Sequence, residues 1–139
     1  MNKAGLFEFL SSQRLGVLGT IAPDGSPQSA LIGIAVTDRL EIVFDTLRTT
    51  RKYRNLVSNP AASFVVGWAG EITVQYEGEA REPVGAELAA YQATYFKTWP
   101  ECRGHLEWPD ITHFVIRPKW VRYSDYGQNP PVIEEFRFD

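Results

Sequence analysis

The chain has 139 residues, of which 44% are apolar and 22% are charged, and its formal net charge is −3. This length suits one hydrophobic core, so we expect a single domain over residues 1–139. The acidic balance argues against nucleic-acid binding, which needs a broad basic surface. The apolar runs are too short for a membrane span and no signal peptide is recognisable. We therefore expect a cytoplasmic protein that binds neither membranes nor nucleic acid.

Few residues indicate metal or thiol chemistry. The single cysteine, Cys102, excludes an internal disulfide and any metal site built from paired cysteines. The two histidines, His105 and His113, have no carboxylate at ligand spacing, so we predict no metal site.

Apolar alternation and turn residues predict a mainly β chain with a few helices. A Pro-Asp-Gly-Ser turn at 23–26 joins the first two strands into a hairpin. Pro118 interrupts the sixth strand, where we expect a bulge or a sheet edge. The predicted strands run over 14–22, 27–37, 40–46, 61–68, 72–81, 111–123 and 132–138. Helices are predicted over 2–12, 50–58 and 83–99, with a loop over 100–110.

Six or seven strands with short turns favour an antiparallel barrel, because closure removes exposed sheet edges. A barrel of this size is filled by its own side chains. A sizeable ligand must therefore bind in an outer groove or between subunits.

The stretch from Val43 to Val66 carries the strongest functional signal. Thr49 and Thr50 stand where a helix N-cap hydroxyl is wanted. Four cations with no acid among them follow the preceding strand, namely Arg48, Arg51, Lys52 and Arg54. A helix N-terminus with hydroxyls and guanidinium groups beside it binds phosphate well. The alternative is that Thr50 only caps the helix and the cations are solvated.

Several motifs resemble the pyridoxamine 5'-phosphate oxidase-like family of FMN-binding split barrels. The resemblance covers roughly residues 14–126. It is carried by Phe44-Asp45-Thr46, Thr50-Arg51-Lys52, Asn55-Leu56, Asn59-Pro60, Leu18-Gly19-Thr20, Asp24-Gly25-Ser26-Pro27 and Glu77-Gly78-Glu79-Ala80. It implies a six- to seven-stranded antiparallel split β-barrel, a homodimer with FMN at the subunit interface and a small-molecule substrate.

The resemblance also implies which residues hold the cofactor. Arg51 and Lys52 would bind the FMN phosphate, with a hydroxyl from Thr50. Backbone groups of Ser29, Ala30 and Leu31 would line the isoalloxazine. Asp45 and Thr46 would lie beside the ring or ribityl chain, and Thr73 would come from the second subunit. No side chain stands out as a catalytic acid or base.

The substrate positions of the family differ in this chain. Ala30 and Ala35 stand where pyridoxamine phosphate oxidases carry an Arg and a Lys, and the tail 125–139 has no histidine. Ser124 replaces an expected tryptophan. These differences remove the charge partners of a phosphorylated vitamin B6 substrate. The expected function is an FMN-dependent oxidoreductase of unknown substrate.

Three alternatives remain open from the sequence. One is a deazaflavin-dependent reductase on the same fold, which could also use Arg48 and Arg54. Another is a non-catalytic flavin- or haem-binding protein, with His105 and His113 as the axial ligands to test. The last is an RNA-binding module that uses the basic turn, which the acidic balance disfavours.

Overall fold

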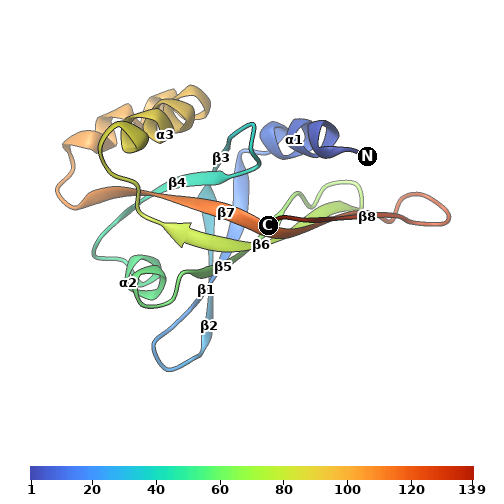
Figure 1. Cartoon of the computed structure of the whole chain (residues 1–139), viewed down its shortest axis with the longest axis horizontal. Helices are drawn as coiled ribbons and strands as arrows, with labels where there is room; N and C mark the ends of the chain where they lie inside the picture. Colours follow the sequence, from blue (N-terminus) through green and yellow to red (C-terminus); the bar gives the residue numbers. More distant parts are fainter.

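The computed structural model describes residues 1–139 and contains one curled antiparallel sheet with helices around it (Figure 1). The strands are β1 (Leu15–Ile21), β2 (Pro27–Gly33), β3 (Ala35–Val36), β4 (Ile42–Leu47), β5 (Ala61–Val66), β6 (Ile72–Arg81), β7 (Ile111–Asp125) and β8 (Val132–Arg137). The helices are α1 (Lys3–Ser12), α2 (Arg51–Ser58), α3 (Gly85–Thr98) and the 3₁₀ helix η1 (Pro100–Glu107). None of the helices combines the length and the apolar character that a membrane crossing needs.

The strand order β2-β1-β5-β6-β7-β4-β3, with β8 added to β7, confirms the expected split barrel. The order begins with β2 and ends with β3, which follow each other in the chain. Only Ile34 separates these two strands, and its N–H donates to the carbonyl of Arg14 at 3.0 Å. The predicted single strand over 27–37 is therefore two strands with a break. β2 lies at one end of the sheet, so one of its edges has no strand partner.

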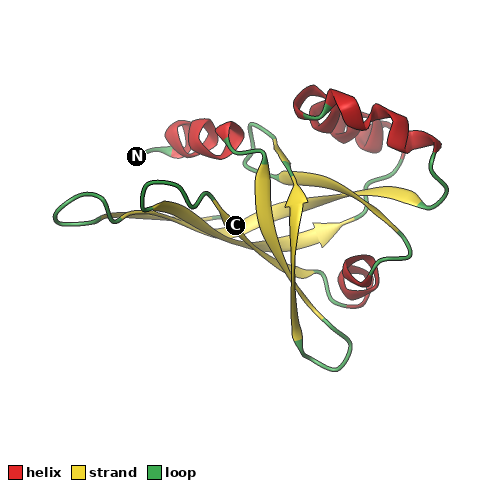
Figure 2. Cartoon of the chain, turned by 180° about the vertical axis from the view of Figure 1, so that it is seen from behind, coloured by secondary structure: helices red, strands yellow, loops and turns green.

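Alternation along β4 divides the core between two layers. Phe44 lies inside the barrel with Phe64 and Phe114, and Leu6 and Leu10 of α1 pack into the same cluster. Val43 points the other way, into a second cluster with Tyr91 and other residues of α3. Figure 2 shows α1 and α3 toward the top of the view and α2 lower, beside the β1–β2 hairpin.

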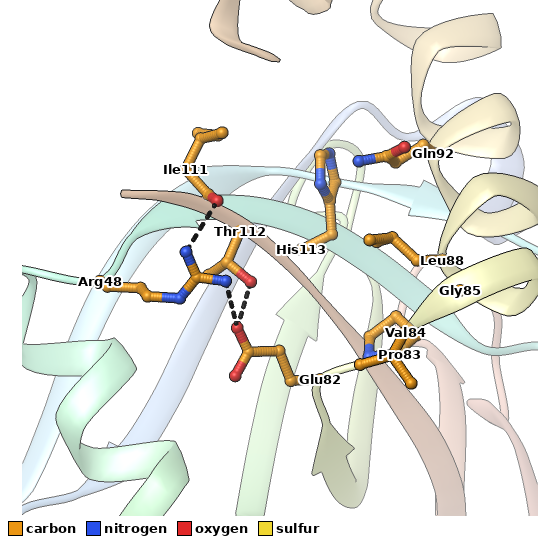
Figure 3. Close-up of a pocket in the computed structure, with 10 residues that line it drawn as sticks. All are labelled: Arg48, Glu82, Pro83, Val84, Gly85, Leu88, Gln92, Ile111, Thr112 and His113. Carbon is orange, nitrogen blue, oxygen red and sulfur yellow. Dashed lines mark hydrogen bonds and ion pairs between the residues drawn. The ribbon is translucent and has the colours of Figure 1, made fainter. Parts of the chain in front are cut away.

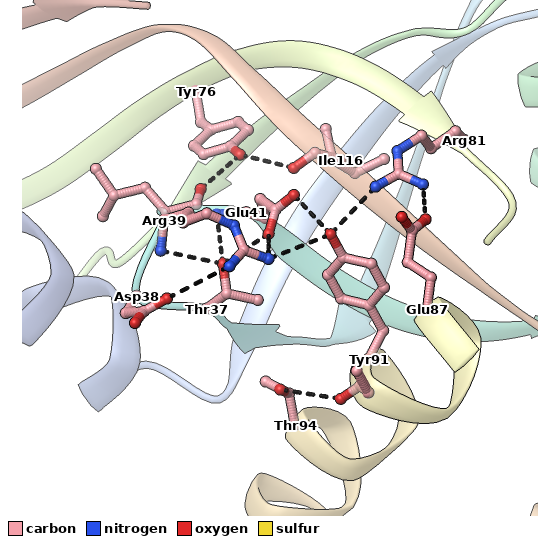
Figure 4. A network of polar contacts seen from close by, with 12 residues as sticks. Thr37, Asp38, Arg39, Glu41, Tyr76, Arg81, Glu87, Tyr91, Thr94 and Ile116 are labelled. Carbon is pink, nitrogen blue, oxygen red and sulfur yellow. Dashed lines mark hydrogen bonds and ion pairs between the residues drawn. The ribbon is translucent and has the colours of Figure 1, made fainter. Parts of the chain in front are cut away.

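A polar network fixes α3 to the barrel (Figure 4). The carboxylate of Glu41, only 7% exposed, accepts hydrogen bonds from Tyr91 at 2.8 Å and from Arg39 at 2.9 Å. Burial, and next the hydrogen bond with Glu41, raise the pKa of Tyr91, so its hydroxyl stays a donor. Arg81 contacts the same hydroxyl at 3.2 Å and connects β6 to α3. This network holds the apolar side of α3 against β3, β4 and β7.

Two sequence predictions concern Pro118 and residues 100–110. Gly78 pairs with Pro118 while Glu77 pairs with Trp120, so Lys119 is the extra residue of a bulge. Of the two alternatives predicted for Pro118, a bulge or a sheet edge, the structure shows the bulge. The predicted loop over 100–110 is wrong for most of its length, because η1 spans Pro100–Glu107.

The bulge leads to a first testable prediction. A Cβ atom at Gly78 would lie 2.3 Å from the carbonyl oxygen of Arg117 and 2.9 Å from a methyl group of Ile116. We expect Gly78→Ala to lower the free energy of unfolding by about 1–3 kcal/mol, the usual cost of overpacking. A Cβ atom added at Gly104 would meet no atom within 4 Å, so Gly104→Ala is the control. It should change the free energy of unfolding by less than about 0.5 kcal/mol. Urea unfolding of the three proteins measures this, and equal stabilities would refute it.

Candidate functional site

The N-terminus of α2 is built as the sequence predicts. Thr50 is the N-cap residue and its hydroxyl accepts a hydrogen bond from the N–H of Tyr53 at 3.3 Å. The same hydroxyl lies 2.9 Å from that of Thr46 at the end of β4 and donates to the carbonyl of Leu47 at 3.0 Å. The turn between strand and helix is thus held by hydroxyl groups, which fixes the direction of the helix.

Asn55 attaches α2 to the first hairpin. Its side chain is 1% exposed, and its amide N–H₂ donates to the hydroxyl of Thr20 at 3.0 Å and to Gln28 at 2.8 Å. Thr20 and Gln28 are cross-strand partners on β1 and β2. The helix N-terminus is thereby placed next to β2, the strand with the free edge.

A cavity of about 420 Å³ lies between this helix N-terminus and the hairpin. We call it the cradle. No acidic side chain lines it, and Arg51 and Lys52 form no ion pair. Arg48, by contrast, pairs with Glu82 at 3.2 Å. The cradle is lined by Leu18, Thr20, Gln28, Ser29, Ala30, Thr49, Thr50, Arg51 and Lys52.

The structure brings together most of the predicted cofactor residues. Two groups of predicted residues about twenty positions apart in the sequence both line the cradle. The first is Ser29 and Ala30, and the second is Thr50, Arg51 and Lys52. Thr46 reaches it through its hydrogen bond to Thr50.

Three predicted residues lie elsewhere. Leu31 continues β2 but is 61% exposed outside the cradle lining. Asp45 points to the opposite face of β4 from Thr46, where Tyr95 donates to its carboxylate at 3.3 Å. Thr73 lies at the start of β6 and pairs with Ser124 of β7. The sequence-based reasoning missed Thr20 and Gln28, although their opposed positions in the first hairpin were a usable signal.

A second hollow of about 580 Å³ adjoins the cradle. The two share Thr20, Gln28 and Ser29 and therefore meet along β2. Alternation places Leu18 and Thr20 of the cradle on the inner face of the hairpin and Gly19 and Ile21 of the second hollow on its outer face. We call the surface along β2 where they meet the groove. Lys119 of the bulge lines the second hollow and pairs with Glu79 at 2.8 Å. This arrangement suits a ligand that has its anionic end in the cradle and extends along β2.

The histidines and tryptophans near η1 occupy a different region. Nδ1 of His105 lies 2.8 Å from the carboxylate of Asp45, and its ring stacks on Trp108 at 3.9 Å. Trp99 packs against Arg14 at 3.9 Å and donates from Nε1 to the carbonyl of Ile34 at 2.9 Å. The contacts of Trp99 hold η1 and α3 to the barrel.

Comparison with known proteins places these features in a family. Residues 3–125 match the family model described as "Pyridoxamine 5'-phosphate oxidase". The chain belongs to the pyridoxamine 5'-phosphate oxidase family. Within 75 residues it is 36% identical to a pyridoxine/pyridoxamine 5'-phosphate oxidase of Thermosynechococcus vestitus. That match covers 53% of this chain but only 36% of the relative.

Solved structures with the same fold bind different cofactors. A heme binding protein from Mycobacterium smegmatis has a TM-score of 0.84 at 22% identity, over 99% of this chain and 58% of the other. A pyridoxamine 5'-phosphate oxidase-related, FMN binding protein from Nostoc punctiforme has a TM-score of 0.68 at 13% identity, over 99% and 93%. At these identities the likeness shows the fold alone, so the cofactor must be argued from the cradle.

Proposed function

We propose that the chain is an FMN-dependent oxidoreductase that binds the flavin phosphate in the cradle. The observation that carries this proposal is the convergence of Arg51, Lys52 and the Thr50 N-cap in a cavity without acids. Unpaired cations, free helix N–H groups and hydroxyls are the donors that a phosphate dianion needs. The family of the chain supports the flavin.

The groove next to the cradle fits the remainder of the cofactor. When bound, the flavin supplies the redox chemistry by accepting or donating a hydride. Alternate residues of β2 direct their backbone N–H and C=O groups to its free edge, so one residue of the Ser29–Ala30 pair offers these groups to a heterocycle. Asn55 holds the hairpin that carries β2 through its hydrogen bonds to Thr20 and Gln28. The hydrogen bond between Thr46 and Thr50 fixes the turn that leads into α2. The chain thus binds and orients the flavin, and no side chain in the groove is assigned as an acid or base.

The direct test of this proposal compares FMN with riboflavin, which lacks the phosphate. We expect FMN to bind at least about tenfold more tightly, because one charge-assisted hydrogen bond contributes about 1.5–3 kcal/mol. Quenching of flavin fluorescence in an equilibrium titration measures both affinities. Equal affinities would contradict phosphate recognition by the cradle.

We further propose that the protein is a homodimer with flavin at the subunit interface. The groove is open to solvent, so a flavin ring in it needs a second wall. Large apolar side chains are exposed near it on the outer strands and the following turn, with Leu31 at 61%, Val65 at 42% and Trp68 at 56%. In such a dimer Thr73 of the partner subunit would complete the site.

The dimer gives a second testable prediction. An interface of at least about 1,000 Å² would make the dimer stable at micromolar concentration. Sedimentation velocity should therefore show a single species of twice the chain mass. Val65→Lys should produce monomers with weakened flavin binding, because a lysine in an interface is costly to bury. A wild-type monomer that retains flavin would refute the proposal.

Haem binding is a second candidate function, and one contact favours it. Since Nδ1 of His105 lies against Asp45, its Nε2 is left available, and this is the usual arrangement of a metal-ligating histidine. His113 is only 1% exposed and is the poorer candidate. Haemin titration of wild type and His105→Gln tests this function. A Soret shift that depends on His105 would support it, and an identical spectrum of both proteins would exclude this ligand.

A further inference from the structure

A separate cavity of about 450 Å³ lies between α3 and the start of β7 (Figure 3). We call it the α3 pocket. The α3 pocket and the cradle share no lining residue. The loop from Leu47 to Thr50 lies between them, with Arg48 lining the α3 pocket and Thr49 and Thr50 lining the cradle. Its lining residues are Arg48, Glu82, Pro83, Val84, Gly85, Leu88, Gln92, Ile111, Thr112 and His113.

Two polar side chains in this pocket have no partner within the protein. The imidazole of His113 is 1% exposed, and its buried Nε2 makes no hydrogen bond. Its ring is held between Tyr95 and Phe96, with centroids 5.4 and 5.7 Å away. Figure 3 shows the amide of Gln92 beside this ring, and no hydrogen bond engages the amide. Buried polar groups are nearly always paired, so an unpaired imidazole in a cavity wall indicates a ligand.

The N-terminus of α3 adds further donors. The first N–H groups of any α-helix have no intrahelical partner and rely on a capping side chain or a ligand. No side chain caps this fourteen-residue helix at Val84. Gly85 has no atom within 4 Å of its Cβ position, so a ligand can approach the backbone there. The end of a helix that carries free N–H groups is favourable for an anion.

The charges around the pocket limit which anion would bind. Arg48 faces the pocket but already pairs with Glu82 at 3.2 Å, and Glu82 also accepts from Thr112. Burial lowers the pKa of His113, against a smaller opposing effect of Asp45, so the imidazole is neutral at pH 7 and offers an N–H. With one carboxylate already present, a monoanion is favoured over a phosphate dianion. Val84, Leu88 and Ile111 supply an apolar wall.

We propose that the α3 pocket binds a small organic acid with a short apolar body. The carboxylate would accept hydrogen bonds from the N-terminus of α3 and from His113 or Gln92, while the apolar body contacts Val84, Leu88 and Ile111. This site is distinct from the cradle and does not depend on the flavin proposal.

NMR titration of the full chain with butyrate tests the proposal, with butyramide as the uncharged probe of equal shape. The chain has only two histidines, so ¹⁵N imidazole signals report on His113 with His105 as the internal reference. We expect saturable shifts at His113 and at the amides of Gly85 and Ala86. A dissociation constant of about 1 mM is within reach of a ligand of about six non-hydrogen atoms. Butyramide should bind at least about tenfold more weakly.

Variants separate this site from others. Gln92 is half-buried on a helix surface, so we expect Gln92→Leu to keep the fold. Gln92→Leu and His113→Phe should each weaken butyrate binding severalfold. Arg51→Ala in the cradle should leave butyrate binding unchanged. Equal binding of butyrate and butyramide, or no saturable shift at His113 with either, would overturn the proposal.

Discussion

Replacing Arg51 with alanine is expected to weaken FMN binding about tenfold to a hundredfold, while riboflavin binding stays nearly constant. Arg51 lines the cradle, is exposed and has no acidic partner, so its guanidinium is free to bind phosphate. One charge-assisted contact contributes about 1.5–3 kcal/mol, which corresponds to this range of affinity. Parallel titrations of both ligands measure the effect.

Arg54 provides the matched control for this experiment. It lies one turn along α2, is exposed and does not line the cradle, yet Arg54→Ala removes the same charge. We expect it to lower FMN affinity less than about threefold, as a screened long-range effect. Equal losses in both variants would mean that the helix attracts FMN only through its general charge. Equal losses of FMN and riboflavin in Arg51→Ala would show that Arg51 does not contact phosphate.

The FMN-loaded protein is expected not to oxidise pyridoxine 5'-phosphate at a useful rate. The cations that would bind the substrate phosphate are missing, since Ala30 lines the cradle and Ala35 is buried under α3. The segment Tyr126–Pro131 forms the turn between β7 and β8. It contains no charged residue that could bind a substrate phosphate above the flavin ring. Three or four lost contacts of about 1.5–3 kcal/mol each lower the rate by several orders of magnitude, even if they add poorly.

The two cations that could replace them are already paired. Lys119 binds Glu79 at 2.8 Å, and Arg122 forms an ion pair with Glu135. Formation of pyridoxal 5'-phosphate under oxygen is the direct assay. Turnover near about one per second, within the ordinary range of enzymes, would contradict the prediction and make vitamin B6 phosphate the substrate.

Local signals in the sequence were sufficient for most of the fold and for the cradle. Pattern and propensity predict features that depend on residues close together in the sequence. The Thr50 cap, the Asn-Pro helix end and the alternation of apolar residues along the strands are of this kind. β6 was predicted with its observed bounds, Ile72–Arg81.

Features that depend on tertiary contacts were not predictable in this way. The break at Ile34 follows from a hydrogen bond to Arg14, and η1 is held by Trp99 and by the pair His105–Asp45. The same limit applies to the basic cluster, because only the structure shows that Arg48 is bound to Glu82 while Arg51 is free. The α3 pocket joins residues 48, 82–92 and 111–113, which no local pattern connects.

The visible spectrum of the protein after exposure to competing cofactors tests the central claim most directly. The purified chain is incubated with FMN, haemin and a deazaflavin coenzyme at equal concentrations and then desalted. We predict that it retains the bands of oxidised flavin, and that Arg51→Ala loses most of them. A retained Soret or deazaflavin band in place of the flavin bands would contradict the assignment of the cradle to FMN.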